Sequence, residues 1–417
     1  MFIHWQIAQH TLSRFLTASY NWSLFGRKRI ERLQSDEDTA LKTGDVIDLD
    51  DTVIDHTYGK KLPFLCWLYD SSQKISVWGM NLVVLHAVLR NGIEYPLNYK
   101  IWRKPAVKGE GPTKFDLAME LLLELRQTVT CRLWVAMDRW YLCKDFFNFL
   151  ELHSFDWVTK AKRNTALFRK ELHPLTGRER FVPVNPKMLI QQVFPSLTRP
   201  GSLGLVGVPI PNIFMKLPVM VANRKGELKK KQKYTAIGVV VAIRLKEDEE
   251  IVQVLSEDND EDQPVSYRGA YVLISNRANV PDEVLSVYSN RWRIEVFFRR
   301  AKQDLGMANC HSTTENHHHA HLELLFAADT LLGYAYWQLN KEKTSDEEGY
   351  THGEMVRGLF HTRCQIRSKN QNGLQTISLD IDIQVRRFAR LIQLYWPDEI
   401  RMLWGEQDNS HYIPSSA

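Results

Sequence analysis

The chain has 417 residues and a net charge of +5, with 44% hydrophobic and 25% charged residues. That length exceeds one ordinary hydrophobic core, so two or three domains, or one domain with a large insertion, are expected. The mildly basic balance permits a polyanionic partner without requiring one. The chain has no stretch of about 18 uncharged apolar residues, so no membrane-spanning helix is expected.

The cysteines are scattered, without a Cys-x-x-Cys pair: Cys66, Cys131, Cys143, Cys310 and Cys364. This spacing argues against a disulfide framework or a zinc ribbon and favours a reducing compartment. The N-terminus has no basic region followed by a long apolar run, so no signal peptide is expected. We therefore predict a cytoplasmic protein.

The first elements in chain order are a helical segment and three strands. Residues 1–36 are rich in aromatic and apolar residues and predict helix, and a short strand at 46–51 ends in a cluster of carboxylates. Residues 81–88 predict a buried strand, which returns through an Asn-Gly hairpin turn as a strand at 95–102.

Four further elements are predicted: a helix at 113–128, a strand at 133–138 ending in Asp138, a helix at 142–152 and a strand at 156–160. Residues 46–160 therefore predict an α/β arrangement with a mixed sheet. Carboxylates follow two of its strands, and ligands of open α/β sheets collect at such strand ends.

Residues 163–268 are rich in Pro, Gly and β-branched residues and predict a β-rich insertion. Its basic run, Arg224–Lys233, is equally compatible with a solvated loop and with phosphate contacts. The α/β pattern resumes at 270–275, and a long helix is predicted from about Pro281 to Leu305, followed by Gly306 as a stop. The remainder, about 316–417, is predicted to be mainly helical, with a polar loop at 367–373.

The predicted helix at 281–305 carries a polar edge beside an apolar stripe. At about 100° per residue, one narrow edge presents side chains of both charge signs: Tyr288, Arg291, Glu295 and Lys302, bordered by Arg299. Taken alone, such a stripe is usually a solvated face with an internal i,i+4 ion pair. The carboxylates at the strand ends favour a functional edge instead.

Two strands that end in carboxylates, together with Glu295, supply what two-metal phosphoryl transfer requires. Two hard cations about 3.5–4 Å apart need several carboxylate oxygens from rigid elements. Basic and hydroxyl groups beside such a site bind phosphates. The pattern therefore predicts metal-dependent phosphoryl transfer.

Three motifs, in this order along the chain, resemble those of prokaryotic insertion-sequence transposases of the DDE type. Asp50-Asp51-Thr52 resembles the family's first catalytic motif, and Met137-Asp138-Arg139 resembles the second. Tyr288-x2-Arg291-x3-Glu295-x6-Lys302 resembles the Y-(2)-R-(3)-E-(6)-K signature, and its Arg-Trp-x-Ile-Glu flank agrees. The resemblance covers about 46–335.

This resemblance implies an RNase H-like fold: a mixed sheet flanked by helices, interrupted by the β-rich insertion, with a helical C-terminal region. It implies cut-and-paste DNA strand transfer with two Mg²⁺ or Mn²⁺ ions per active site, held by Asp51, Asp138 and Glu295. It assigns DNA contacts to Tyr288, Arg291 and Lys302, and more loosely to Lys160 and Arg299. The expected partners are double-stranded transposon ends, target DNA and a second copy of the chain in a synaptic complex.

The first acidic motif holds three candidates. On a strand, Asp48 and Asp50 share one face and Asp51 takes the other, and this alternation favours none of them. The resemblance selects Asp51, directly before Thr52, with Asp50 as its rival.

The expected organisation has five parts: a helical N-terminal segment at 1–40, the core at 46–162, the insertion at 163–268, the second part of the core at 269–335 and a helical C-terminal region at 336–417. Relatives carry a longer helical region ahead of the first motif, so either a shortened DNA-binding region or a misassigned start is expected. Two alternative functions stay open: a DNA-binding remnant that no longer transposes, and an RNase H-like nuclease without strand transfer.

Overall fold

The computed structural model describes residues 14–16, 18–59, 61–70, 74–105, 107, 110–197, 204–222, 228–245, 269–341, 362–370 and 373–381. They fall into two compact units. The larger unit comprises Ile30–Arg90 and Leu97–Phe298. The smaller comprises the chain up to Arg29, Asn91–Pro96 and the chain from Arg299 onward.

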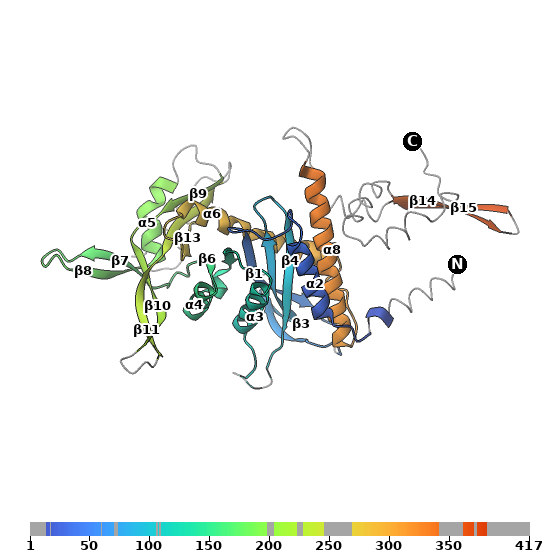
Figure 1. Ribbon diagram of the computed structural model, residues 1–417, viewed down its shortest axis with the longest axis horizontal. Helices are drawn as coiled ribbons and strands as arrows, with labels where there is room; N and C mark the ends of the chain where they lie inside the picture. Colours follow the sequence, from blue (N-terminus) through green and yellow to red (C-terminus); the bar gives the residue numbers. More distant parts are fainter. Residues whose placement is uncertain are drawn as a thin grey trace. The chain divides into compact units, whose positions relative to one another are not determined.

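A nine-stranded mixed sheet organises the larger unit (Figure 1). Its first strands are β1 (Val46–Asp55), β2 (Cys66–Asp70), β3 (Ile75–Val88), β4 (Glu94–Trp102), β5 (Leu133–Met137) and β6 (Phe155–Lys160). Beyond β6 follow β13 (Tyr271–Ser275), β12 (Gly238–Leu245) and β9 (Gly204–Pro209), while β4 pairs with β3. β1 runs antiparallel to β3 and parallel to β5, which confirms the predicted mixed α/β sheet.

Helices of the larger unit lie against this sheet. They are α3 (Lys114–Arg126), the 3-10 turn η1 (Arg139–Tyr141), α4 (Lys144–Leu152), α5 (Pro186–Leu197) and α6 (Pro281–Asn290). Thr113 and Asp116 form a capping box that fixes the start of α3. α6 packs across the strands β5, β6, β12 and β13, and its Val284 and Val287 join the core there. This packing fixes the start of the segment that carries Arg291 and Glu295.

The predicted helix at 281–305 is in fact two helices, and this part of the prediction was wrong. α6 ends at Asn290, and α7 (Trp292–Gln303) begins after Arg291. The Arg291 amide donates to the carbonyl of Tyr288 at 3.2 Å, an i,i−3 bond that tightens the chain between the helices. Arg291 keeps helical dihedrals at this one-residue interruption, so the predicted polar edge continues from α6 into α7.

The insertion is only partly a separate β-structure. β7 (Leu167–Leu172), β8 (Glu179–Val184), β10 (Ile213–Ala222) and β11 (Leu228–Ala236) form a second sheet in the order β11-β10-β7-β8. Its other strands, β9 and β12, extend the central sheet instead, and α5 is a helix that the sequence did not predict. The basic run lies in β11 from Leu228 onward, and its earlier residues fall outside the described part.

The smaller unit contains the beginning of α2 (Trp22–Gln34) and α8 (Glu315–Lys341). Arg300 binds Glu94 at 2.6 Å and Asp329 at 3.3 Å, and Asp329 is fully buried. Burial raises the pKa of Asp329 to about 6, although the charge of Arg300 opposes that shift. Among the described helices, none has both the length and the apolar character of a membrane span.

The C-terminal prediction was wrong in one described segment. β14 (Thr362–Asn370) and β15 (Gly373–Ile381) form an antiparallel pair where helix and a polar loop were expected. The predicted helix at residues 1–13 and the other residues after Lys341 lie outside the described part.

Asp156 gives a stability prediction for the larger unit. Its carboxylate is 3% exposed and binds Arg132 at 2.6 Å and Arg277 at 2.7 Å. Asp156→Ala removes these charge-assisted bonds between β5, β6 and the end of β13, so we expect the free energy of unfolding to fall by about 2–3 kcal/mol. Urea unfolding checks this. Glu171→Ala, which breaks a more exposed pair with Arg180 at 3.7 Å, should cost less than about 1 kcal/mol.

Candidate active site

Asp50 and Asp138 follow the last registered pair of two parallel strands. The β1–β5 ladder ends at Leu49 and Met137, which lie opposite each other. Asp50 and Asp138 are the next residues along, so they occupy matching positions at the same sheet edge. Asp138 begins the η1 turn, but its side chain does not cap that turn. The pairing of the two strands therefore places both carboxylates at the same edge of the sheet.

Negative charge is concentrated around Asp50. Burial, followed by the charge of Asp51, raises the pKa of Asp50 to about 7, and Asp138 contributes in the same direction. The Asp51 amide donates to Asp50 Oδ1 at 2.8 Å and the Arg291 charge lies nearby, and both oppose the shift. Asp50, Asp51 and Asp138 are here called the carboxylate cluster. Their combined negative charge exceeds the positive charge of the neighbouring side chains, and such a setting suits a divalent cation.

Arg291 joins this cluster to the third predicted carboxylate. Its Nη1 lies 3.5 Å from Asp50 Oδ2, and its Nη2 lies 2.6 Å from Glu295 Oε1. Burial lowers the pKa of Arg291, but neighbouring Tyr288, Glu295 and Asp50 raise it above its ordinary value, so the guanidinium stays charged. The guanidinium of Arg291 thus lies between Asp50 and Glu295 and contacts both carboxylates.

Asp51 has different partners. Its Oδ2 accepts from Lys114 Nζ at 2.6 Å and from Asn81 Nδ2 at 2.8 Å. Lys114 also lies over the ring of Trp140 at 5.4 Å. Burial, with the charges of Asp51, Asp50 and Asp138, raises the pKa of Tyr141 well above its ordinary value, so this phenol faces the cluster in its neutral form.

Lys160 and Tyr288 form the side of the site nearest β6. The Lys160 ammonium lies 4.1 Å from the ring centre of Tyr271 and 5.6 Å from that of Tyr288. Burial and the charge of Arg291 lower the pKa of Lys160, while Asp138 and Glu295 oppose this. Tyr288 is 6% exposed and belongs to the hydrophobic core between α6 and the sheet. Its ring packs against the side chains of Lys160 and Arg291 from the core side.

The structure thus brings Asp50, Asp138, Arg291, Glu295 and Lys160 into one neighbourhood. Within the described residues, no three His, Cys, Asp or Glu side chains are arranged as a ready metal cage. The carboxylates nevertheless carry more negative charge than the nearby cations neutralise, and carboxylate oxygens are suitable ligands for Mg²⁺ or Mn²⁺. Asp50, Asp138 and Glu295 are the residues that would hold such ions. Arg299 and Lys302 lie in the smaller unit, near the end of α7.

Sequence reasoning missed three residues of the site: Asn81, Lys114 and Tyr141. Asn81 interrupts the buried run of β3 and is itself fully buried, which is a signal that a polar partner is required. Lys114 and Tyr141 carried no comparable signal, because their approach to Asp51 depends on how α3 and η1 pack.

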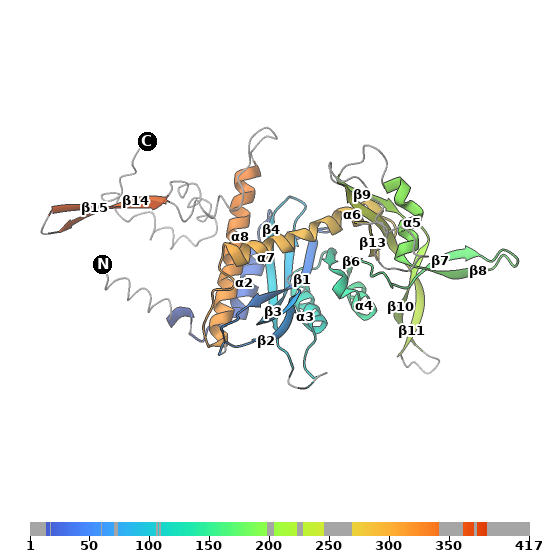
Figure 2. The same ribbon diagram turned by 180° about the vertical axis from the view of Figure 1, so that it is seen from behind.

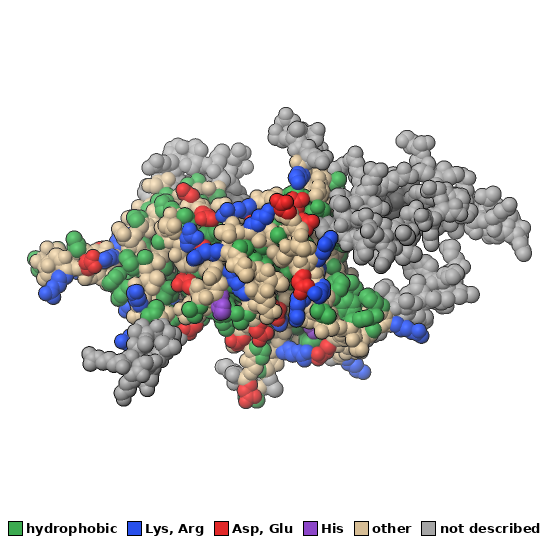
Figure 3. All heavy atoms as spheres, in the orientation of Figure 1, with side chains coloured by type: hydrophobic (Ala, Val, Ile, Leu, Met, Phe, Trp, Pro, Cys, Tyr) green, Lys and Arg blue, Asp and Glu red, His purple; other side chains and the backbone are tan. Residues whose placement is uncertain are grey.

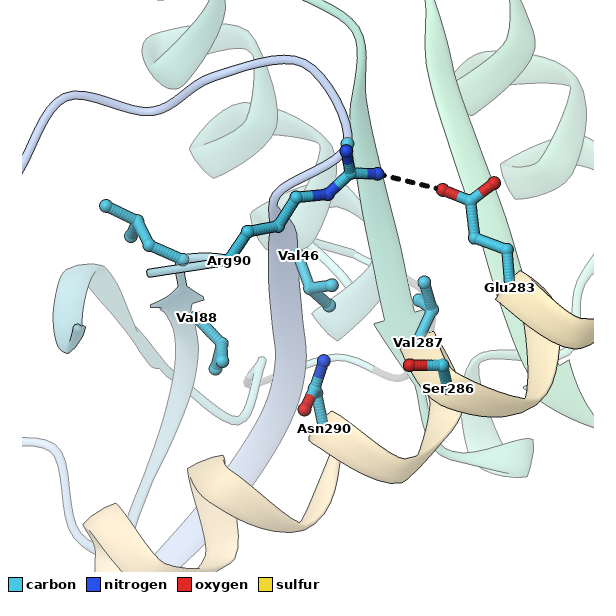
Figure 4. Close-up of a pocket in the computed structure, with 9 residues that line it drawn as sticks. Val46, Val88, Arg90, Glu283, Ser286, Val287 and Asn290 are labelled. Carbon is cyan, nitrogen blue, oxygen red and sulfur yellow. Dashed lines mark hydrogen bonds and ion pairs between the residues drawn. The ribbon is translucent and has the colours of Figure 1, made fainter. Parts of the chain in front are cut away.

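A small pocket of about 110 Å³ lies between the start of β1 and α6 (Figure 4). Arg90 and Trp134 both donate to Glu283 Oε1, at 3.0 and 3.1 Å, and anchor the first turn of α6. The Arg90 guanidinium lies against Gly44, whose φ of +90° and lack of a side chain leave room for it. The hydrogen bonds from Arg90 and Trp134 to Glu283 therefore hold the first turn of α6 against the sheet.

The fold and the cluster together define a candidate centre for metal-dependent phosphoryl transfer. The family model described as the transposase DDE domain matches residues 42–331, so the chain belongs to the DDE transposase domain family.

The comparison with curated proteins returned no match. Among solved structures, the chain is similar to a piggyBac transposase determined by cryo-EM as a synaptic complex with hairpin DNA. The sequence identity is 10% and the TM-score 0.39, over 90% of this chain and 60% of that chain. The chain therefore spans about 60% of the length of that transposase.

Proposed function

We propose that this chain is a divalent-metal-dependent DNA transposase that cleaves insertion-sequence ends and joins them to target DNA, on an RNase H-like core. The observation that carries the proposal is the placement of Asp50 and Asp138 at matching positions on parallel strands, with Arg291 linking Asp50 to Glu295. Membership of the DDE transposase domain family supports the same chemistry.

The first catalytic carboxylate in this proposal is Asp50 rather than Asp51. Asp50 shares the sheet edge with Asp138 and contacts Arg291, whereas Asp51 is held by Lys114 and Asn81. Mg²⁺ or Mn²⁺, when bound, would activate a water molecule or the 3′-hydroxyl of the DNA end and stabilise the leaving oxygen. Asp50, Asp138 and Glu295 would hold the cations, and the backbone amide of Asp51 donates a hydrogen bond to Asp50.

The basic groups beside the carboxylates are proposed to bind DNA. Lys160 and Arg291 supply cations next to the cluster, and phosphate oxygens are the groups that such side chains bind in DNA. Lys302 and Arg299 stay predicted phosphate contacts. Tyr288 is buried, and its ring packs against Lys160 and Arg291. Double-stranded transposon ends and target DNA are the substrates, and a homodimer in a prokaryotic cytoplasm is the proposed working form.

Strand transfer of a pre-cut, labelled end into a plasmid tests the proposal. The end is taken from the inverted repeats that flank the coding sequence, and Mg²⁺ or Mn²⁺ is supplied. The wild type is expected to join ends, while Asp138→Asn and Glu295→Gln lose joining by at least about a thousandfold because a metal ligand is removed. Both variants should still bind the duplex in a fluorescence anisotropy measurement.

Asp145→Asn is the matched control, because this exposed carboxylate of α4 lies seven residues after Asp138 and outside the cluster. It should join ends as the wild type does. Absence of joining with every divalent metal, with duplex binding retained, would show a DNA-binding remnant. Equal cutting of unrelated duplexes without joining would show a nuclease.

A further inference from the structure

The positively charged side chains of the candidate active site differ in what they contact. Over the molecular face drawn in Figure 3, basic and acidic side chains are interspersed, so surface charge alone does not distinguish them. Arg291 bridges two carboxylates, and Lys114 contacts Asp51 at 2.6 Å. Lys160 differs from both, because no carboxylate of the described residues lies within ion-pair distance of its ammonium.

Lys160 lies in one row with two of the proposed metal ligands. The parallel ladders of β1, β5 and β6 stay in register as far as Met137 of β5. The residues that follow this register on the three adjacent strands are Asp50, Asp138 and Lys160, and neighbouring strands lie about 4.8 Å apart. The lysine is therefore one strand away from Asp138 at the same edge of the sheet.

The side chains of this row point to the same face of the sheet. The residues that precede them by an even number of positions on the three strands belong to the hydrophobic core that α6 covers: Val46, Ala136 and Val158. Asp138 keeps an extended backbone, so the alternation of side chains continues to the end of the row. The row is thus directed to the side of the sheet on which α6 lies (Figure 2).

Two aromatic rings hold the Lys160 ammonium without neutralising its charge. It lies 4.1 Å from the ring centre of Tyr271 and 5.6 Å from that of Tyr288. Burial, followed by the charge of Arg291, lowers the pKa of Lys160, and the charge of Asp138 limits this shift. Lys160 is therefore a partly buried cation that releases its proton more readily than an ordinary lysine.

The other donors among the described side chains of the site are poorly suited to proton transfer. A guanidinium does not lose its proton in proteins, so Arg291 can bind a phosphate but cannot protonate it. Burial raises the pKa of Tyr288 and that of Tyr141, so both phenols hold their protons more tightly than usual. Lys114 is engaged with Asp51, which strand alternation places on the opposite face of β1 from the row.

We propose that Lys160 is the catalytic proton donor to the leaving 3′-oxygen when the DNA strand is cut. As water attacks the phosphorus atom, the bond from phosphorus to the 3′-oxygen breaks, and a proton on Lys160 Nζ passes to that oxygen. The attacking water releases one proton to solvent, and solvent returns one proton to Lys160. The inference rests on the proposed function, and it assigns to Lys160 a role beyond the phosphate contact proposed above.

Single-turnover cutting of two matched duplex ends in Mn²⁺ tests the inference. One end carries the natural 3′-oxygen as the leaving atom, and the other carries a 3′-sulfur, because a thiolate leaves without a proton. Lys160→Gln and Lys160→Arg are expected to cut the oxygen substrate about a hundredfold more slowly than the wild type, and the sulfur substrate within about threefold of the wild-type rate. Lys160→Arg keeps the positive charge, so it separates proton donation from phosphate binding.

Lys162→Gln is the matched control, because Lys162 is exposed and lies two residues beyond Lys160, after the end of β6. It should cut both substrates at the wild-type rate when the protein is present in excess. Thermal unfolding and fluorescence anisotropy with the uncut duplex show that each variant is folded and binds DNA.

Equal slowing of the two substrates in Lys160→Gln would overturn the inference, since it would show a loss of phosphate binding. Cutting of the oxygen substrate at the wild-type rate by Lys160→Arg would also overturn it, because a positive charge would then suffice. Both outcomes leave the proposed function intact. If the wild type binds the duplex but cuts neither substrate with any divalent metal, the proposed function fails and the inference fails with it.

Discussion

Asp50→Asn is expected to abolish strand transfer, with a loss of at least about a thousandfold, whereas Asp51→Asn should lose only about tenfold. Asp50 shares the sheet edge with Asp138 and contacts Arg291, so its substitution removes a proposed metal ligand. In Asp51→Asn, the amide oxygen can still accept from Lys114 and Asn81. Joining of a pre-cut end, measured by single-turnover kinetics in Mg²⁺, separates the two variants.

The comparison is symmetrical, because each variant removes one charge from neighbouring residues of one strand. Thermal unfolding and duplex binding of both proteins control for misfolding and for loss of DNA contact. A loss of joining that is greater for Asp51→Asn than for Asp50→Asn would return the first catalytic position to Asp51, as the family resemblance predicted.

Asp50→Asn is also expected to make the metal-free protein more stable at neutral and alkaline pH. The pKa of Asp50 is raised from 3.8 to about 7, so the folded state holds this proton more tightly than the unfolded chain does. The ionised carboxylate therefore costs stability above about pH 7, and this cost fades as the pH falls toward 3.8. At pH 8, the variant should gain about 1–3 kcal/mol, less than the full shift corresponds to because the side chain is partly solvated.

Thermal or urea unfolding of both proteins in chelator, from pH 8 to pH 4.5, measures this difference. The advantage of Asp50→Asn should shrink steadily as the pH is lowered. Added Mg²⁺ at pH 8 should stabilise the wild type and do little for the variant, because a ligand that binds only the folded state raises its stability. Parallel pH profiles for the two proteins would contradict the raised pKa, and the Asp145→Asn variant should follow the wild type.

The sequence alone predicted the mixed sheet and the carboxylates at its edge, because strand alternation and strand ends are local patterns. The proposal of Asp50 in place of the predicted Asp51 uses information that is not local in the sequence. It depends on the register in which Leu49 pairs with Met137, and that register is fixed by tertiary packing.

The one-residue interruption of the helix at Arg291 could not be predicted from the sequence, for a different reason. The tight bond between the Arg291 amide and the Tyr288 carbonyl inserts no residue, so the helical spacing of apolar side chains continues across it. The missed helix α5 contains Ile190, Val193 and Pro195, residue types that favour strands or loops. Likewise, the sequences of β9 and β12 do not predict that these strands extend the central sheet next to β13, because strand pairing depends on residues far apart in the chain.

The second sheet is assembled from two hairpins that are separate in the sequence. This arrangement limits which insertions and deletions the protein can accept, in evolution or by design. The hairpins β7–β8 and β10–β11 meet through only two registered pairs, Ile213 with Arg169 and Phe214 with Phe168. Between them the chain returns through α5 and β9 to the central sheet. Either hairpin tip can lengthen or shorten without rebuilding the catalytic edge, whereas excision of the whole insertion would remove two strands from the central sheet.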